Sequence, residues 1–399
     1  IKKVNYNNHM KQKRGRGILK SFQIKTKINF GKGALESLEQ LAGKKVLLIT
    51  DPFMVKSGLV NEVIKYLQKS EYTVFCDIVP DPPMEVVTAG IKEFERFMPD
   101  VVVALGGGSA IDTSKAIVYF AKKILNLENI KLEDVKLIVI PTTSGTGSEA
   151  TSFSVITDAQ KGVKYPLVSD ELLPDVAILD PELVKSVPSN VTADTGMDVL
   201  THAIEAYVST QSHDCSDALA ERAIKLVCEY LPKAYADGDD IKAREKMHNA
   251  SCLAGIAFDK VSLGINHSIA HAIGAKFHIS HGRANSLLLV HVIDYNSQIK
   301  GYKTIEFSET AKKYAEISSF LKLNIFNEKI AVDSLKDAII KLQKQLNMPL
   351  TLTECGIDAK EVESMKDEIA ELALNDNCTK TNPVKPTKED IIKILEKII

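Results

Sequence analysis

The sequence contains no long apolar run. Its longest uninterrupted apolar stretches, such as residues 101–105, have the length of a buried strand, whereas a membrane-spanning helix needs about 20 apolar residues. The formal net charge is only −2 over 399 residues, so composition favours neither a nucleic-acid nor an anionic-membrane partner. We therefore expect a soluble protein, and its 45% hydrophobic content is enough for two substantial domains.

The sequence also has no C-x-x-C spacing among its six cysteines. That spacing is typical of thiolate zinc sites and of redox-active disulfides, so neither is indicated. Most of the cysteines lie in segments with helical periodicity. This favours reduced thiols in a cytoplasmic setting.

Residues 1–17 combine several cations with almost no apolar periodicity. The cations are Lys2, Lys3, Lys11, Lys13, Arg14 and Arg16. We expect a disordered basic arm. A cloning remnant or a misplaced start are alternatives, because the first residue is Ile1 and His9 is followed by Met10. The arm shows no amphipathic face, so the pattern does not indicate a tag that docks on a larger assembly.

Residues 18–190 alternate between strand and helix periodicity. Residues 22–30 alternate as an antiparallel strand should, and buried strands are expected at 46–50, 73–78, 101–105 and 137–140, with helices at 34–41, 59–69, 86–96 and 111–125. Repeated units of this length predict an α/β domain with a doubly wound, mostly parallel sheet. Its ligand should bind at the carboxyl ends of the strands.

Two glycine-rich turns follow two of these strands. The segment GGGS at 106–109 follows the strand that ends at Leu105 and opens a helix, and TTSGTGSE at 142–149 follows the next strand. No G-x-G-x-x-G spacing follows Thr50, at the end of the first buried strand, and each of the two turns alone is more often an ordinary tight turn. Together they bring bare backbone amides, hydroxyls and a helix N-terminus to one edge, which predicts a diphosphate cradle for a dinucleotide.

Asp51 directly follows the first buried strand. A carboxylate at this position can accept hydrogen bonds from the adenosine ribose and repels a 2′-phosphate. We therefore expect NAD(H) to be preferred over NADP(H).

From residue 191 to 399 the strand periodicity stops. Helical periodicity is found at 192–209, 217–236, 241–258, 269–277, 284–298, 311–320, 332–345 and 361–374. This predicts an all-α second domain.

Histidines cluster in this second half. Five of the nine fall in two short windows, at His202, His267, His271, His278 and His281. In helices, Asp198 and His202 would project from one face, as would His267 and His271, because each pair is four residues apart. One Asp and three His could complete a site for zinc or ferrous iron, and one imidazole would remain for proton transfer. The alternative is a set of core histidines with satisfied hydrogen bonds.

Several motifs resemble the signatures of the iron-containing alcohol dehydrogenases, from about residue 22 to the C-terminus. They are GGGSAIDTSKA, PTTSGTGSE, ADTGMDVLTHAIEAYVS, and HSIAHAIG with a later HG. The resemblance implies a dehydroquinate synthase-like fold. Within the family, KYPL, DVAILDPELVKSVP and KMHNASCLAGIAF are most similar to the 1-propanol dehydrogenases of propanediol utilisation.

The resemblance also implies roles for individual positions. By matching position, the metal ligands would be Asp198, His202, His267 and His281, and His271 would lie close to the substrate and the nicotinamide. The dinucleotide would be surrounded by Asp51, Gly107, Gly108, Ser109, Thr142, Thr143, Thr146 and Lys164. The chain departs from the family pattern at Ser280, usually Pro, and at Val384, commonly Arg.

The expected function is thus metal-assisted oxidation of short primary alcohols, or the reverse reduction of aldehydes, with His271 as the catalytic acid–base. A 1,3-propanediol or lactaldehyde/1,2-propanediol oxidoreductase of the same family is an alternative. A dehydroquinate synthase-like lyase would need a more basic pocket than the helices around Arg283 offer. A non-catalytic metal- and nucleotide-binding scaffold would favour a closed, thiolate-rich site.

The expected metal ion and oligomeric state follow from the family resemblance more than from the residues themselves. An Asp/His₃ set binds zinc more tightly than ferrous iron, so the expectation of Fe²⁺ comes from the family and Zn²⁺ stays an alternative. The resemblance also implies a homodimer or larger homo-oligomer, and association with a bacterial microcompartment.

Overall fold

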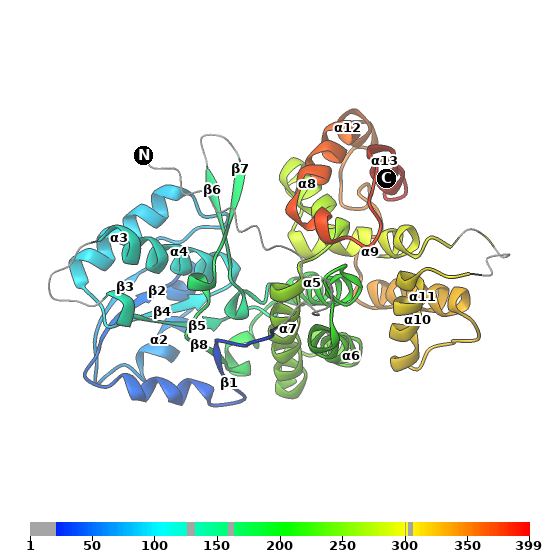
Figure 1. The fold of residues 1–399 in the computed structure, drawn as a ribbon. Helices are drawn as coiled ribbons and strands as arrows, with labels where there is room; N and C mark the ends of the chain where they lie inside the picture. The colour runs from blue at the N-terminus through cyan, green and yellow to red at the C-terminus, as the bar shows by residue number, and fades with distance from the viewer. Residues whose placement is uncertain (1–20, 126–131, 159–162, 300, 302–305) are drawn as a thin grey trace, which may run out of the picture.

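The computed structural model describes residues 21–125, 132–158, 163–299, 301 and 306–399, and the expected basic arm at 1–17 lies outside them. A sheet of six parallel strands forms the centre of the N-terminal half, in the order β1-β8-β5-β4-β2-β3 (Figure 1). The strands are β1 (Lys27–Phe30), β2 (Lys45–Ile49), β3 (Glu71–Phe75), β4 (Val101–Gly106), β5 (Lys136–Pro141) and β8 (Val176–Leu179).

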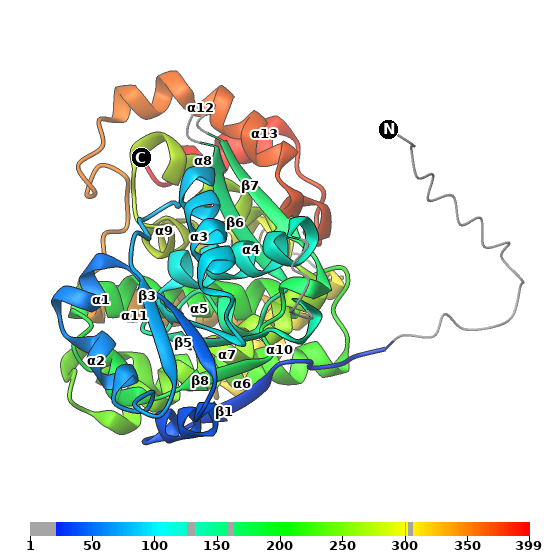
Figure 2. The same cartoon turned by 90° about the vertical axis from the view of Figure 1, so that its left-hand side faces the viewer.

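Helices cover both faces of this sheet (Figures 1 and 2). They are η1 (Ala34–Leu41), α1 (Pro52–Lys56), α2 (Leu59–Ile64), α3 (Met84–Phe97) and α4 (Gly108–Ile124), with a short 3₁₀ turn η2 (Leu132–Asp134). One core joins the sheet to α3 and α4 through residues such as Phe94 and Ile117. A second core joins the opposite face to η1 and α2 through Leu38 and Val63. The predicted doubly wound α/β arrangement is confirmed.

Two strand predictions were wrong or incomplete. The segment 22–30 forms a strand only at its end, and β1 pairs in parallel with β8, not antiparallel. Alternation of polar and apolar residues reports which side of a sheet a residue faces, but not the direction of the neighbouring strand. An antiparallel hairpin of β6 (Phe153–Asp158) and β7 (Val163–Val168) was not predicted, and it forms a separate two-stranded sheet.

The C-terminal half is helical from α5 onward, as predicted. It contains α5 (Ser189–Val208), α6 (Asp214–Ala236), α7 (Ile241–Val261), α8 (Ile265–Phe277), α9 (His281–Ser297), α10 (Glu309–Phe320), α11 (Glu328–Gln345), α12 (Ala359–Asn375), η6 (Asn377–Thr381) and α13 (Lys388–Glu396). The last two were not predicted. The proposed boundary at 190/191 falls in the first turn of α5.

Helix α5 lies at the centre of the helical half. It packs against α6, α7 and α9, and from Thr192 onward it is buried on nearly all sides. A helix that is buried all round must be lined with apolar or internally satisfied side chains. Polar residues on α5 are therefore placed inside the protein, and this determines where the site can form.

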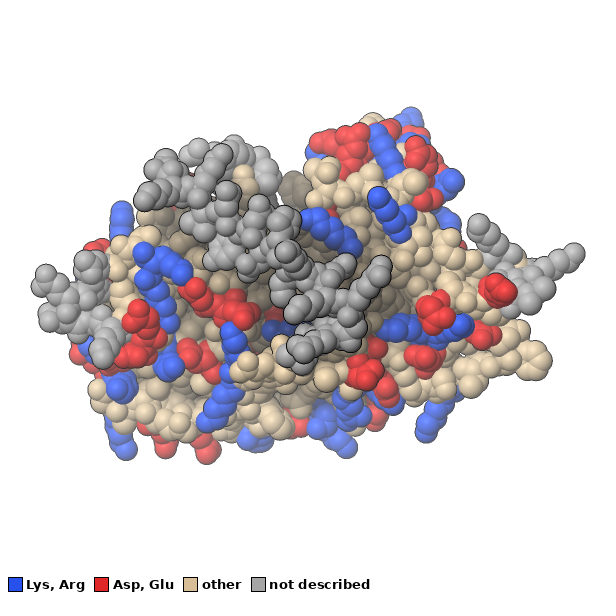
Figure 3. Space-filling model, in the orientation of Figure 1, with Lys and Arg blue, Asp and Glu red and all other residues tan. Residues whose placement is uncertain are grey.

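The described surface carries both signs of charge. On the face shown in Figure 3, Lys and Arg side chains are interspersed with Asp and Glu. Within the described ranges, no helix is long and apolar enough to cross a membrane.

Candidate metal centre and dinucleotide cradle

Three helices bring four polar side chains to one point. Asp198 and His202 come from one face of α5, His267 from the first turn of α8, and His281 is the first residue of α9. One ligand atom of each lies within 4.8 Å of those of the others. We call these four residues the metal centre. They are the four that the family resemblance implied.

The separations suit a single cation. Oδ1 of Asp198 lies 3.7 Å from Nε2 of His267 and 3.5 Å from Nε2 of His281, and Oδ2 lies 4.0 Å from Nδ1 of His202. Ligand atoms around one tetrahedral zinc or iron ion lie roughly 3.4 Å apart, because each metal–ligand bond is about 2.1 Å. Movements of a few tenths of an ångström would therefore complete the site.

Two imidazole nitrogens of the metal centre have no hydrogen-bond partner in the described part of the protein. Among the described residues, Nε2 of His267 and Nδ1 of His202 are buried without a hydrogen bond. An unsatisfied buried polar atom costs about 1–3 kcal/mol. A cation that accepts both lone pairs would remove this cost, so the residues present fit a divalent metal.

The electrostatics point the same way. Burial lowers the pKa of His202 to about 4, so its ring is neutral at pH 7 and offers a lone pair. Burial also opposes the charged form of His267, but the carboxylates of Asp198 and Glu205 outweigh it and raise the pKa of His267 to about 9. Two buried carboxylates beside one imidazole thus favour a positive charge at His267. A bound cation can supply that charge in place of a proton.

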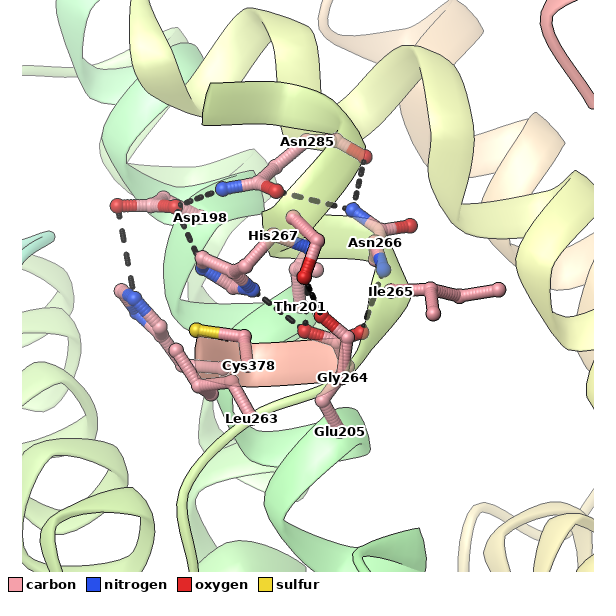
Figure 4. A network of polar contacts seen from close by, with 12 residues as sticks. Asp198, Thr201, Glu205, Leu263, Gly264, Ile265, Asn266, His267, Asn285 and Cys378 are labelled. Carbon is pink, nitrogen blue, oxygen red and sulfur yellow. Dashed lines mark hydrogen bonds and ion pairs between the residues drawn. The ribbon is translucent and has the colours of Figure 1, made fainter. Parts of the chain in front are cut away.

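A polar network that the sequence reasoning missed supports the metal centre (Figure 4). Oε2 of Glu205 lies 2.5 Å from Nδ1 of His267, and its Oε1 accepts the backbone amide of Asn266 at 2.8 Å. The side-chain amide of Asn285 donates to Oδ1 of Asp198 at 2.7 Å and lies 3.1 Å from Nε2 of His281. Such contacts set the tautomer and orientation of metal ligands.

A helical-spacing argument could have found both supporting residues. Glu205 lies seven residues after Asp198 on α5, and Asn285 lies four residues after His281 on α9. Each is therefore on the face of its helix that carries a ligand.

His271 lies one turn beyond His267 and faces a different environment. Its side chain is 45% exposed, whereas that of His267 is fully buried. Its Nδ1 lies 2.9 Å from Oδ2 of Asp376, and its ring stacks on that of His281 with centroids 5.3 Å apart. Burial raises the pKa of Asp376, but the hydrogen bond with His271 reverses this and holds it below its usual value. His271 is therefore held beside the metal centre, with Nε2 left for another partner.

The two glycine-rich turns meet at the carboxyl ends of β4 and β5. A Cβ on Gly107 would lie 3.5 Å from the side chain of Thr143, and one on Gly108 would lie 2.9 Å from that of Thr146. Gly106 has φ +150°, and a Cβ there would approach Oδ2 of Asp51 to 3.2 Å. The structure thus brings Asp51, Gly107, Gly108, Thr143 and Thr146 of the expected dinucleotide positions together.

The cradle has donors to offer. Oγ1 of Thr142 is buried without a partner among the described residues, and Gly107 and Ser109 lie at the start of α4, where no side chain caps the free amides. These groups fit a diphosphate. Of Lys164 the structure gives only the backbone, in β7, paired with Thr157; its side chain lies outside the description.

The second turn is fastened to the helical half. Oγ of Ser144 lies 2.9 Å from Nδ1 of His248 on α7. A Cβ on Gly147 would lie 2.7 Å from Cα of Gly255, also on α7, and one on Gly145 would lie 2.8 Å from Thr195 on α5. The cradle therefore abuts the same helix that carries Asp198.

Comparisons with known proteins agree with this geometry. A family model for iron-containing alcohol dehydrogenases matches residues 25–181, and the model for the C-terminal part of the same family matches residues 192–399. The 1-propanol dehydrogenase PduQ of Citrobacter freundii is 43% identical over 96% of this chain and 100% of its own length. The NADPH-dependent butanol dehydrogenase of Clostridium saccharobutylicum is 41% identical over 94% of this chain and 97% of its own.

A solved 1,3-propanediol oxidoreductase superposes with a TM-score of 0.86 at 33% identity, covering 95% of this chain and 99% of that one. The fold is accordingly dehydroquinate synthase-like, as the sequence predicted. With both halves matched, and with relatives similar over nearly their whole length, the chain belongs to the iron-containing alcohol dehydrogenase family.

Proposed function

We propose that this enzyme interconverts short primary alcohols and aldehydes, with 1-propanol and propanal as the best pair, using NAD(H) and ferrous iron. The observation that carries the proposal is the metal centre, two of whose four residues lie on α5, the helix that abuts the dinucleotide cradle. Zinc is the alternative metal, because an Asp/His₃ set accepts either ion.

The substrate class rests on the relatives. Two named 1-propanol dehydrogenases, from Citrobacter freundii and Salmonella typhimurium, are 43% and 41% identical to this chain. The second candidate is a 1,3-propanediol oxidoreductase, which the likeness of that solved structure favours. The proposal also includes a homo-oligomer and association with a bacterial microcompartment, as the family resemblance of the sequence implies.

The bound groups would supply the reactive chemistry: a divalent metal acts as a Lewis acid toward an alcohol oxygen, and a nicotinamide exchanges hydride with the carbinol carbon. The chain's own residues hold these groups in place. Asp198, His202, His267 and His281 would bind the metal, while Gly107, Gly108, Ser109, Thr142, Thr143 and Thr146, with Lys164, would surround the dinucleotide. Phe258 stacks on the His202 ring at 4.6 Å and forms an apolar wall beside it.

His271 would transfer the proton. Its Nδ1 contacts Asp376 at 2.9 Å, so the ring is oriented and Nε2 is the nitrogen available to exchange a proton with a substrate hydroxyl or a water. The 45% exposed side chain gives that proton a route to solvent.

Asp51 would set the cofactor preference. Its Oδ1 accepts the amides of Phe53 and Met54 at the start of α1, and its Oδ2 lies near Gly106. A fixed negative charge beside the cradle disfavours the 2′-phosphate of NADP(H). The butanol dehydrogenase relative is named NADPH-dependent, so the cofactor choice is tested directly.

The test is an alcohol panel on protein purified without oxygen and reconstituted with Fe²⁺ or Zn²⁺. Formation of the reduced nicotinamide is followed with ethanol, 1-propanol, 1-butanol, 1,2-propanediol and 1,3-propanediol, each with NAD⁺ and with NADP⁺. We expect the highest kcat/KM for 1-propanol with NAD⁺. A higher value for 1,3-propanediol would move the substrate to the second candidate, and no reduction with any pair would overturn the proposal.

A further inference from the structure

His281 is held differently from the rest of the metal centre. Its side chain is 40% exposed, against 5% for Asp198 and 6% for His202. It is the first residue of α9 and follows a short irregular segment that begins at His278, whose φ is +53°. A ligand at the end of a helix needs support from outside that helix, because terminal residues have fewer constraints of their own.

We propose that Asp194, Ser280 and Arg283 form a latch that positions His281 for metal binding. The proposal rests on the proposed role of the metal centre. Oγ of Ser280 donates to Oδ2 of Asp194 at 2.6 Å, and Nε of Arg283 donates to Oδ1 of the same carboxylate at 3.2 Å. The two donors lie on either side of His281 in the sequence, so one carboxylate holds the chain both before and after the ligand.

The serine hydroxyl is used in an unusual way. Ser280 occupies the N-cap position of α9, where a hydroxyl commonly accepts an amide of its own helix. Its side chain makes no cap hydrogen bond, and it donates to Asp194 on α5 instead. The hydroxyl therefore joins two helices, and the latch is a contact between elements.

The latch fixes the position of His281 relative to Asp198. Asp194 lies one turn before Asp198 on α5. The start of α9 touches the same turn, since a Cβ on Gly282 would lie only 2.0 Å from the carbonyl oxygen of Asp194. The 3.5 Å separation between Oδ1 of Asp198 and Nε2 of His281 thus depends on how α9 is held at this point.

The contact between Asp194 and Arg283 is largely shielded from solvent. The side chain of Asp194 is 12% exposed and that of Arg283 is 32% exposed. Hydrogen bonds to a charged group in such a setting are stronger than those between neutral groups. Loss of a residue that orients a ligand usually costs about 10- to 100-fold in metal affinity.

The test is the rate at which the zinc-loaded full chain releases zinc to a chromogenic chelator. Wild type is compared with Ser280→Ala, with Ser280→Thr, which keeps the hydroxyl, and with the control Ser364→Ala. The hydroxyl of Ser364 donates to the backbone carbonyl of Glu361 in its own helix, and to no other group among the described residues. We expect release about 10-fold faster from Ser280→Ala, and rates close to wild type for the other two. The zinc-free proteins should share one melting temperature.

A second pair of variants isolates the contact. Asp194→Ala should also release zinc faster, and adding Ser280→Ala to it should accelerate release no further, because the carboxylate through which Ser280 acts is already absent. Unchanged release from Ser280→Ala, or additive effects in the double variant, would overturn the latch. A lower melting temperature with unchanged release would identify a packing residue. Asp198→Ala separates the two claims: if wild type holds zinc no better than this variant, the metal centre itself fails.

Discussion

At the scale of residues, two histidines one turn apart on α8 share the same chemistry and differ in burial. A carboxylate contacts Nδ1 in each case, Glu205 for His267 and Asp376 for His271. In each ring Nε2 is therefore the nitrogen that is available for metal binding or proton transfer. The fully buried His267 points at Asp198 and suits a metal, whereas the 45% exposed His271 suits a proton. We therefore propose different roles for two histidines that differ only in their surroundings.

Glu205→Gln tests the support of His267. Glutamine keeps an acceptor for the Asn266 amide but removes the negative charge beside Nδ1 of His267. We expect metal affinity to fall by about 10- to 100-fold. Competition with a chelator of known affinity measures it, with Glu309→Gln, at a side chain that is 89% exposed, as the control. Equal affinities in all three proteins would remove Glu205 from the site.

His271→Ala tests the proton role. The variant should keep its metal and lose about 10²- to 10⁴-fold in kcat, the usual scale for an absent acid–base group. Metal content and kcat are measured on the same preparation. Metal loss equal to that of His267→Ala would make His271 a ligand, and a nearly normal kcat with a lowered melting temperature would make it a packing residue.

Asp51→Asn tests the cofactor preference. Asn keeps the side-chain acceptor for Phe53 and Met54 but removes the charge. We expect the ratio of kcat/KM for NADPH to that for NADH to rise by roughly tenfold, which corresponds to about 1.4 kcal/mol. Asp51→Gly would be a poorer test, because it removes the side chain that caps α1 together with the charge. An unchanged ratio in Asp51→Asn would assign the choice to another residue.

At the scale of elements, the segment after β5 carries a buried acid whose ionisation should affect stability. Glu149, in η3 (Ser148–Ala150), is 2% exposed, and burial raises its pKa from 4.5 to about 7, although Lys115 opposes the shift. The folded protein therefore binds this proton more tightly than the unfolded chain. The stability it contributes is complete below about pH 4.5 and is lost as the pH rises through 7.

Glu149→Gln should remove that dependence. Between pH 5 and pH 8, the free energy of unfolding of the wild type should fall relative to that of the variant by on the order of 2 kcal/mol. Urea unfolding of both proteins at the two pH values measures the difference. Parallel pH profiles would show that the carboxyl is ionised in the folded state throughout.

The sequence predicted the long elements better than their neighbours. Helices α5 and α7 extend over 20 and 21 residues, and a helical pattern of that length in the sequence is a strong signal. The direction of β1, the β6–β7 hairpin and the late helix α13 depend on contacts far along the chain, which a local pattern does not record. The residues that we propose as metal ligands stood out because histidines are rare, whereas Asp194 and Glu205 were missed because acidic residues are common on helices.

At the scale of the whole molecule, helix α5 connects the metal centre with the dinucleotide cradle. It carries Asp198 and His202, its Thr195 touches Gly145 in the cradle, and its Asp194 holds the start of α9. The neighbouring α7 is in contact with the same turn through Gly255. The dinucleotide cradle and the metal centre are thereby fixed to one buried helix, although the cradle is built from the α/β half.

The central claim is that Asp198, His202, His267 and His281 hold one catalytic divalent cation. The most direct measurement is metal content together with 1-propanol-dependent NADH formation, on wild type and Asp198→Ala purified without oxygen and reconstituted with Fe²⁺. The account predicts about one iron per chain and turnover in the wild type, and neither in the variant, because no spare ligand replaces the carboxylate. An Asp198→Ala protein with stoichiometric iron and full activity would contradict it.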